Sequence, residues 1–143
     1  MNIEFTKMDG LVDKHPSLFS PDHKGRRFSF WCDEGWFNII SSALQCIEER
    51  LKRVKNADVD FKFAQIKEKF GGLRIYTDGY SDDHIHGIID MAEAMSYKTC
   101  EVTGKPGFLC KKGTWVKTLC LEKAEELGYS KYERPTTKGE NDT

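Results

Sequence analysis

Three of the five cysteines in this 143-residue chain recur at intervals of ten, at Cys100, Cys110 and Cys120. Three thiolates could hold zinc with one more ligand, because closed structural zinc sites take four thiolate or imidazole ligands. The positions where a Cys-x-x-Cys knuckle and a Cys-x-x-His helix start would supply further ligands hold Thr103 and Lys123. Neither side chain replaces a thiolate or an imidazole. We therefore predict no cofactor, and zinc only if Cys100, Cys110 and Cys120 act together as its ligands.

The densest charge lies in residues 67–74, Lys-Glu-Lys-Phe-Gly-Gly-Leu-Arg. Lys67 and Lys69 point the same way on an extended strand, and Arg74 can return beside them on a partner strand. Together with exposed amide hydrogens at the two glycines, these bases could hold a phosphate or a carboxylate. The alternative is a solvated sheet face in which Glu68 partners one of the bases. Basic and aromatic side chains near a rigid hairpin are our predicted contact residues: Lys67, Lys69, Arg74 and Trp36.

A thiol and two carboxylates also stand together in Cys32-Asp-Glu-Gly-Trp36. A cysteine nucleophile needs a histidine base within reach, and no motif places one of the four histidines there. A helix cap at Asp33 followed by a core tryptophan explains the same residues. We therefore predict no catalytic residue. A phosphate-handling hydrolase that uses Asp33, Glu34 or a histidine is the least favoured alternative.

The overall charge and hydropathy restrict the class of protein. A net charge of -1 and a pI near 6.4 argue against a generic DNA-coating protein, although they allow a local basic patch. No run of about 18 apolar residues is present, so no membrane contact is expected. The N-terminus lacks the apolar core of a signal peptide. We therefore expect a cytoplasmic protein whose cysteines stay reduced.

Hydrophobic periodicity predicts an α+β core over residues 28–99, after an irregular lead-in over residues 1–27 with a helical turn near residues 11–19. A brief extended segment at 28–32 leads to a helix over 36–54, whose apolar residues recur every three or four positions. Alternation then predicts strands at 59–67 and 73–77, joined by a loop longer than two residues. Ser81 caps a second helix, in which Gly87 would mark a close helix contact.

Residues 100–128 predict a small hairpin followed by a short helix that Gly128 ends. Apolar packing around the cysteines, with Trp115, Pro106, Phe108 and Leu119, would replace a metal there. Residues 129–143 are polar and without periodicity, so we expect a mobile tail. The predicted fold is two amphipathic helices on a small antiparallel sheet, with a degenerate zinc-finger-like hairpin and helix at the C-terminal end.

Three motifs occur in a fixed order along residues 28–128. They are Phe30-x-Cys-x-x-Gly-Trp36, then Gln65-Ile-Lys-Glu-Lys-Phe-Gly-Gly-Leu-Arg-Ile-Tyr76, and a cysteine-rich end from Ala92 to Cys120. In this order the chain resembles a family of small uncharacterised proteins carried by bacteriophages and prophages. The resemblance implies a zinc-finger-like C-terminal unit, from which this chain departs at Thr103 and Lys123. It supplies a setting and no mechanism.

From the residues and this setting we expect a cytoplasmic, phage-type binding protein without catalysis. It would act on a host component, most simply a host protein, for instance as an inhibitor of a host defence system. Binding of a nucleic acid or a nucleotide through the basic hairpin is the first alternative. A homodimer is a further option, because 12% of the residues are aromatic.

Overall fold

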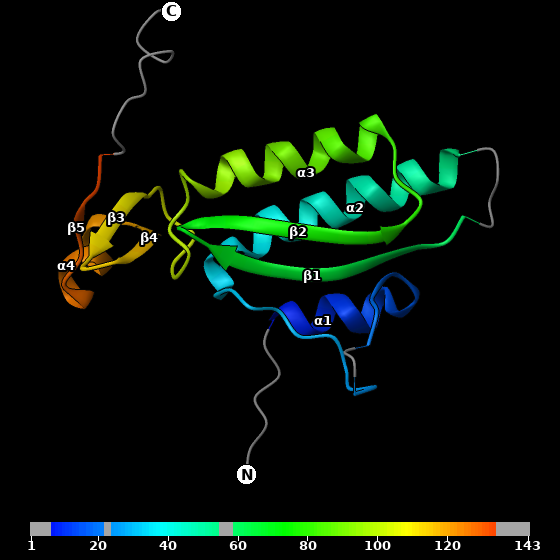
Figure 1. Cartoon of the computed structure of the whole chain (residues 1–143), viewed down its shortest axis with the longest axis horizontal. Coiled ribbons are helices and arrows are strands. Elements are labelled where there is room, and N and C mark those ends of the chain that lie inside the picture. The colour runs from blue at the N-terminus through cyan, green and yellow to red at the C-terminus, as the bar shows by residue number, and fades with distance from the viewer. Residues whose placement is uncertain (1–6, 22–23, 55–58, 134–143) are drawn as a thin grey trace, which may run out of the picture.

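The computed structural model describes residues 7–21, 24–54 and 59–133, which fold into helices and two small antiparallel sheets (Figure 1). The predicted α+β class is thereby confirmed. None of the helices in this described part of the chain is long and apolar enough to cross a membrane. In chain order the elements are α1 (Lys7–Lys14), the 3-10 helices η1 (Pro16–Leu18) and η2 (Glu34–Trp36), α2 (Phe37–Arg53), β1 (Phe61–Lys69), β2 (Gly72–Gly79), α3 (Asp83–Ser96), β3 (Phe108–Lys112), β4 (Trp115–Leu119), α4 (Leu121–Leu127) and β5 (Ser130–Lys131).

The larger unit is the β1–β2 hairpin with α2 and α3 packed on one of its faces (Figure 1). Helix α2 forms as the apolar spacing predicted, and its inward stripe includes Ile40, Leu44 and Ile47, each at most 2% exposed. Burial of each such side chain contributes about 1.5–3 kcal/mol. In the described part of the chain, α2 and α3 lie on the same side of the hairpin, so the side chains of its opposite face are the ones left for other molecules.

A bulge in β1 decides which side chains reach that open face. Phe61 and Phe63 are buried, and strict alternation would bury residues 65, 67 and 69 with them. The register instead shifts between Phe63 and Gln65, and Ile66 takes the next buried position. An extra residue of this kind moves every later side chain to the other face. Lys67 and Lys69 consequently point away from the helices.

The turn of the hairpin is tighter than predicted. Only Phe70 and Gly71 separate β1 from β2, and both have positive φ, 52° and 86°. Two-residue loops of this hand match the twist of the strands they join. A Cβ added to Gly71 would lie 2.7 Å from Leu109 Cδ1, and one on Gly72 would lie 2.3 Å from Tyr97 Cζ. The glycines therefore let the tip contact both the end of α3 and the C-terminal unit.

The expectation of an irregular lead-in is wrong for residues 7–14. These residues form α1, whose Met8, Leu11 and Val12 are buried in the main core. Two later segments pair with the free edge of β1 through single parallel bridges, Phe19 with Phe63 and Trp31 with Lys67. At the second bridge the Trp31 amide donates to Ile66 O and Trp31 O accepts from the Glu68 amide, both at 2.9 Å.

The predicted caps and the predicted role of Gly87 need correction. Asp33 precedes η2, but its side chain makes no capping hydrogen bond. Helix α3 is capped by Asp82, whose carboxylate accepts from the Ile85 amide at 2.9 Å, one residue later than predicted. Ser81 instead contacts His86. Gly87 has no atom within 4 Å of an added Cβ, so it marks no close contact.

The C-terminal unit lies at the tip of the hairpin (Figure 1). Its sheet has the order β4-β3-β5, and α4 ends as predicted at Gly128, whose φ is 79°. The prediction of a mobile tail is wrong at its start, because β5 pairs with β3 and the Tyr132 amide donates to Leu109 O at 2.9 Å. The rest of the predicted tail, residues 134–143, lies outside the described residues.

Candidate functional site

Two of the predicted contact residues share the open face of the hairpin. Lys67 lies opposite Arg74 in the register, and Lys69 lies opposite Gly72. Ile66, which precedes Lys67, and Ile75, which follows Arg74, point into the core and are at most 9% exposed. The sequence prediction that Lys67, Lys69 and Arg74 lie side by side is therefore confirmed.

Arg74 is already engaged within the fold. Its guanidinium forms an ion pair with Glu93 of α3, and Nη2 donates to Tyr97 Oη at 3.1 Å. It therefore fastens β2 to the end of α3, and much of its charge is neutralised there. We leave Arg74 out of the candidate contact surface.

The predicted contact role of Trp36 is wrong. Its side chain is fully buried, and Nε1 donates to Thr99 O at 2.9 Å. A side chain without exposed surface cannot touch a partner, so the core reading of Trp36 is the correct one. The exposed tryptophans are Trp31 and Trp115, at 69% and 71%. Local sequence does not distinguish the buried tryptophan from the exposed ones, because all three adjoin predicted strands or helices.

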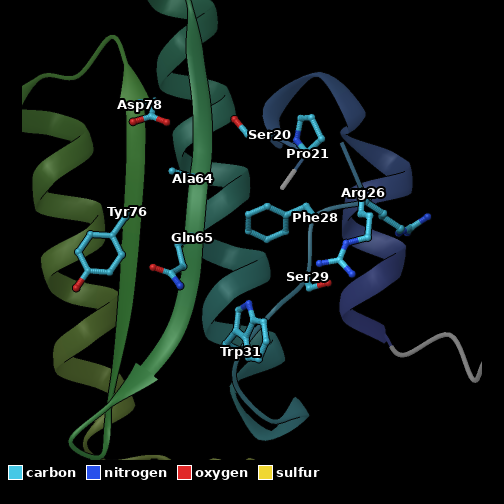
Figure 2. Close-up of a pocket in the computed structure, with 11 residues that line it drawn as sticks. Ser20, Pro21, Arg26, Phe28, Ser29, Trp31, Ala64, Gln65, Tyr76 and Asp78 are labelled. Atoms are coloured by element: carbon cyan, nitrogen blue, oxygen red, sulfur yellow. The ribbon is translucent and has the colours of Figure 1, made fainter. Parts of the chain in front are cut away.

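The first part of the open face is a hollow of about 800 Å³ between the hairpin and the segment that leads to Trp31. Figure 2 shows Tyr76, Gln65 and Trp31 around its opening, with the helices behind the strands. Phe28 forms part of the wall and is itself almost fully buried. The polar lining of the hollow includes Ser20, Arg26, Ser29, Gln65 and Asp78.

Two smaller hollows continue this depression toward the hairpin tip. The next, of about 400 Å³, shares Trp31 and Gln65 with the first and adds Lys67 and Glu68. The last, of about 240 Å³, shares Glu68 and reaches Phe70 and Trp115 across the junction with the C-terminal unit. Because neighbouring hollows share lining residues, we treat them together as the outer groove.

Exposed aromatic side chains are concentrated in the outer groove. In the described part of the chain, the large aromatic residues that remain exposed all line one of its hollows: Trp31, Phe70, Tyr76 and Trp115. Scattered apolar residues on a surface need no explanation, but a contiguous group indicates an interaction site. The outer groove is therefore the candidate functional site.

Two lysines of the outer groove, Lys67 and Lys69, make no ion pair with the described residues. Across residues 7–21, 24–54 and 59–133, neither Lys67 nor Lys69 has a carboxylate partner, and the Lys69 ammonium lies 5.8 Å from the Phe70 ring centroid. Glu68 does not pair with either lysine. Its Oε2 accepts from the Gly71 amide at 2.8 Å and so holds the tight turn. Of the alternative interpretation, the pairing of Glu68 with a lysine is therefore wrong, whereas a solvated sheet face agrees with the exposure of Lys69.

A buried carboxylate fixes the wall that carries Trp31. Glu101 is 2% exposed, its Oε1 pairs with Lys117 Nζ at 3.2 Å, and its Oε2 accepts from the Asp33 amide at 3.0 Å. Its carbonyl also accepts from the Gly35 amide at 2.7 Å. Burial raises the pKa of Glu101, while Lys117 acts in the opposite direction. The sequence offered no signal for this role, because Glu101 reads there as an ordinary exposed turn residue.

Within the described ranges, no histidine is hydrogen-bonded or ion-paired to Cys32, Asp33 or Glu34. Burial, followed by the nearby Glu101, raises the pKa of Cys32 to about 12, so this thiol stays protonated and is a poor nucleophile. Among the described histidines, His15 pairs with Glu48 and His86 contacts Ser81. His23 lies outside the described residues. Neither His15 nor His86 forms a hydrogen bond or an ion pair with Cys32.

The three evenly spaced cysteines meet in a small core of their own. Cys100 and Cys110 are fully buried and Cys120 is 6% exposed. Thr103 joins two of them, since its amide donates to Cys100 Sγ at 3.4 Å and its hydroxyl to Cys120 Sγ at 3.6 Å. Burial works to raise the pKa of Cys100, but hydrogen bonds, that of Thr103 first, outweigh it and lower the pKa.

These cysteines do not form a recognisable metal centre. Within the ranges that the structure describes, no group of three or more His, Cys, Asp or Glu side chains is placed to hold a metal ion. Phe108 and Leu119 pack on the cysteines as predicted. The predicted packing of Trp115 and Pro106 there is wrong, because both side chains are exposed.

Comparisons of the chain with protein-family models, curated proteins and solved structures gave no match. The resemblance to a phage and prophage family therefore remains a prediction from the motifs themselves. Function has to be argued from the outer groove.

Proposed function

We propose that this chain is a non-catalytic binding protein that engages another macromolecule through the outer groove. The observation that carries the proposal is the gathering of the exposed aromatic side chains near Lys67 and Lys69, which form no ion pair with the described residues. Aromatic side chains give large contact area at low entropic cost and dominate the energetics of binding surfaces. Elsewhere on the described surface, the large exposed hydrophobic side chains are methionines and leucines.

The rigidity of the hairpin supports a binding role. Gly71 and Gly72 fit closely against neighbouring side chains, Arg74 fastens β2 to α3, and Trp31 is hydrogen-bonded to β1. The contact residues are thus held in place before a partner arrives. Such preorganisation raises affinity because less conformational entropy is lost on binding.

The proposed setting is that of a phage-type protein in the cytoplasm of a host cell, where it acts on a host component. Inhibition of a host defence system is the specific form of this proposal. Its support is the resemblance of the motifs over residues 28–128, together with the accessory roles that small phage proteins commonly have. The raised pKa of Cys32 and the separate pairs of His15 and His86 support the absence of catalysis.

The test is retention of host components on the immobilised protein, compared between wild type and Lys67→Glu/Lys69→Glu. The matched control is Lys14→Glu/Arg53→Glu, which changes the net charge equally at exposed sites outside the outer groove. We expect a specific component to be retained by wild type and control and lost from the groove variant. Equal retention by all three would refute the outer groove as the contact surface.

A homodimer through the same groove is the competing use of this surface. Sedimentation velocity at increasing protein concentration separates the two. A dimer that Trp115→Ala dissociates would assign the groove to self-association instead.

A further inference from the structure

We infer that the outer groove binds single-stranded nucleic acid, with bases stacked on its aromatic side chains and phosphates along Lys67 and Lys69. This inference rests on the proposed function and names the chemical class of the partner. The net charge of -1 does not argue against a nucleic-acid partner, because the charge that contacts phosphates is local. Four observations carry it: the kind of apolar side chain, the placement of the lysines, the polar lining and the shape of the groove.

The apolar side chains of the groove are of the kind that stacks. Trp31 and Tyr76 stand at one end and Phe70 and Trp115 at the other, each at least 43% exposed. Nucleobases stack on such rings regardless of sequence because every base has a π-face. Protein–protein interfaces are also rich in aromatic residues, so the lysines and the polar lining decide between the two kinds of partner. The exposed large aliphatic residues of the described chain all lie outside the three hollows: Met91, Met95, Leu121 and Leu127.

The lysines lie between the two aromatic ends. Lys67 and Lys69 are two residues apart on one face of a strand, which places them about 7 Å apart. This spacing is comparable to the phosphate repeat of an extended single strand. Neither ammonium group has an ion-pair partner among the described residues, and Glu68 between them accepts a hydrogen bond from the Gly71 amide. Two phosphates can therefore follow β1 without first breaking a salt bridge.

Hydrogen-bonding groups line the widest hollow, next to Trp31 and Tyr76. Gln65 supplies an amide, and Ser20 and Ser29 supply hydroxyls that can both donate and accept. These are groups that contact base edges or sugars, and the hollow of about 800 Å³ can admit a splayed nucleoside. Its walls are therefore suited to a base that has left its neighbours.

The dimensions favour one strand rather than a duplex. The groove follows β1 from Ala64 to Phe70, a path of about 20 Å, which is room for only a few nucleotides. Its rings can stack only with bases that are not paired. Two neutralised phosphates predict a slope of about -1.4 for log affinity against log salt on a single strand.

The experiment measures fluorescence anisotropy of labelled oligothymidine and oligouridine, with a hairpin-free DNA duplex as the third probe. The DNA and RNA arms distinguish the two sources of a single strand. We expect at least one of the two single strands to bind the wild-type protein with the predicted salt slope. The duplex should compete poorly with that single strand. Trp31→Ala is expected to weaken binding roughly 5- to 100-fold, as loss of one stacked base implies.

The charge variants test the phosphate contacts. Lys67→Glu/Lys69→Glu should lower affinity at least about tenfold at low salt and flatten the salt slope, because its two counterion releases are lost. The control Lys14→Glu/Arg53→Glu should keep the wild-type slope. Thermal unfolding of every variant establishes folding, and Trp115→Ala at the far end of the groove serves as a second stacking variant if Trp31→Ala unfolds.

Three outcomes would overturn the inference: no single strand binds at low salt, the duplex competes as well as the single strand, or the control variant loses binding equally. If no oligonucleotide binds but a host protein is retained and is lost from Lys67→Glu/Lys69→Glu, the groove is a protein-docking surface. The proposed binding function would then stand, and only its assignment to nucleic acid would fail.

Discussion

The hairpin unit and the C-terminal unit are stabilised in different ways. In the described residues, the hairpin unit has a core of eighteen buried apolar side chains, whereas the C-terminal unit has five, and three of those are cysteines. So small a core rarely supports a fold alone, and small units of this kind usually rely on metals or disulfides. Here hydrogen bonds from Thr103 to two sulfurs take part of that role.

Attachment to the hairpin supplies the rest. Thr118 Oγ1 donates to Gly71 O at 2.7 Å, and Glu101 holds both the Cys32–Trp36 segment and Lys117. The C-terminal unit is therefore stable as part of the larger fold. The comparison shows how a unit with a small core can keep its shape by docking on a neighbour.

The largest effect on the difference between the two units should come from giving the C-terminal unit a metal site. The Thr103 hydroxyl donates to Cys120 Sγ at 3.6 Å, and Lys123 follows Cys120 by three residues in α4. Thr103→Cys/Lys123→His would complete four ligands with Cys100 and Cys120. We expect one zinc per chain by elemental analysis, and about 4 kcal/mol of added stability when free zinc is a thousandfold above its Kd.

The control for that variant is Thr103→Ser/Lys123→Arg, which should bind no zinc. Absence of zinc from the Cys/His variant would show that the loop geometry no longer suits a metal. Stoichiometric zinc in the wild-type protein would contradict the view that hydrogen bonds to sulfur stand in for it.

The next largest effect should follow from removing the contacts of Glu101 that join the C-terminal unit to the hairpin unit. Glu101→Ala leaves Lys117 without its anion and the Asp33 amide without its acceptor. Loss of one partner of a buried pair is strongly destabilising, and we expect about 3 kcal/mol in urea unfolding, because Lys117 keeps some solvent contact. Glu125→Ala on exposed α4 is the control. A cost below about 1 kcal/mol for Glu101→Ala would mean that the two units hold together by other contacts.

A smaller effect of opposite sign should come from α3 in the hairpin unit. Gly87 lies within this helix and has open space around an added Cβ. Gly87→Ala should therefore stabilise the protein by up to about 1 kcal/mol, because alanine loses less backbone entropy in a helix. Gly35→Ala is the contrasting variant, since its Cβ would lie 2.3 Å from the Cys100 and Glu101 carbonyl oxygens. Destabilisation by Gly87→Ala would show an unrecognised contact on this face.

The smallest expected effect is a pH dependence at the attachment. Burial raises the pKa of Glu101 above the ordinary value of 4.5, with Lys117 partly offsetting it. The stability from this shift is fully present below pH 4.5 and is lost as pH rises through the folded pKa. The stability of wild type relative to Glu101→Gln should therefore fall in urea unfolding as pH rises above 4.5. An opposite trend would mean that Lys117 outweighs burial.

Local pattern predicted most of the elements correctly. The apolar spacing placed α2, alternation placed the β1–β2 hairpin, and Gly128 placed the end of α4. Such patterns are readable because they follow directly from helical and strand geometry. The α1 helix was missed because its apolar residues are few and its Gly10 weakens the helical signal.

The site was less predictable than the fold. Lys67 and Lys69 were identified from charge alone, but Trp31 and Trp115 were not chosen, and Trp36 was chosen wrongly. Burial of a tryptophan depends on which elements pack around it. That information lies in contacts between residues far apart in the chain, such as Trp36 with Thr99 and Trp31 with Ile66.

The sequence by itself determined the α+β class, the order of the elements and the pair of lysines on the hairpin, because each depends on neighbours in the chain. Only the tertiary structure decided that these lysines face outward and that four aromatic rings surround them. A bulge at Ala64 reverses the alternation before Lys67, and Glu101 holds the segment beside Trp31 against β4. Both effects come from packing and hydrogen bonding across the fold, which local periodicity does not encode.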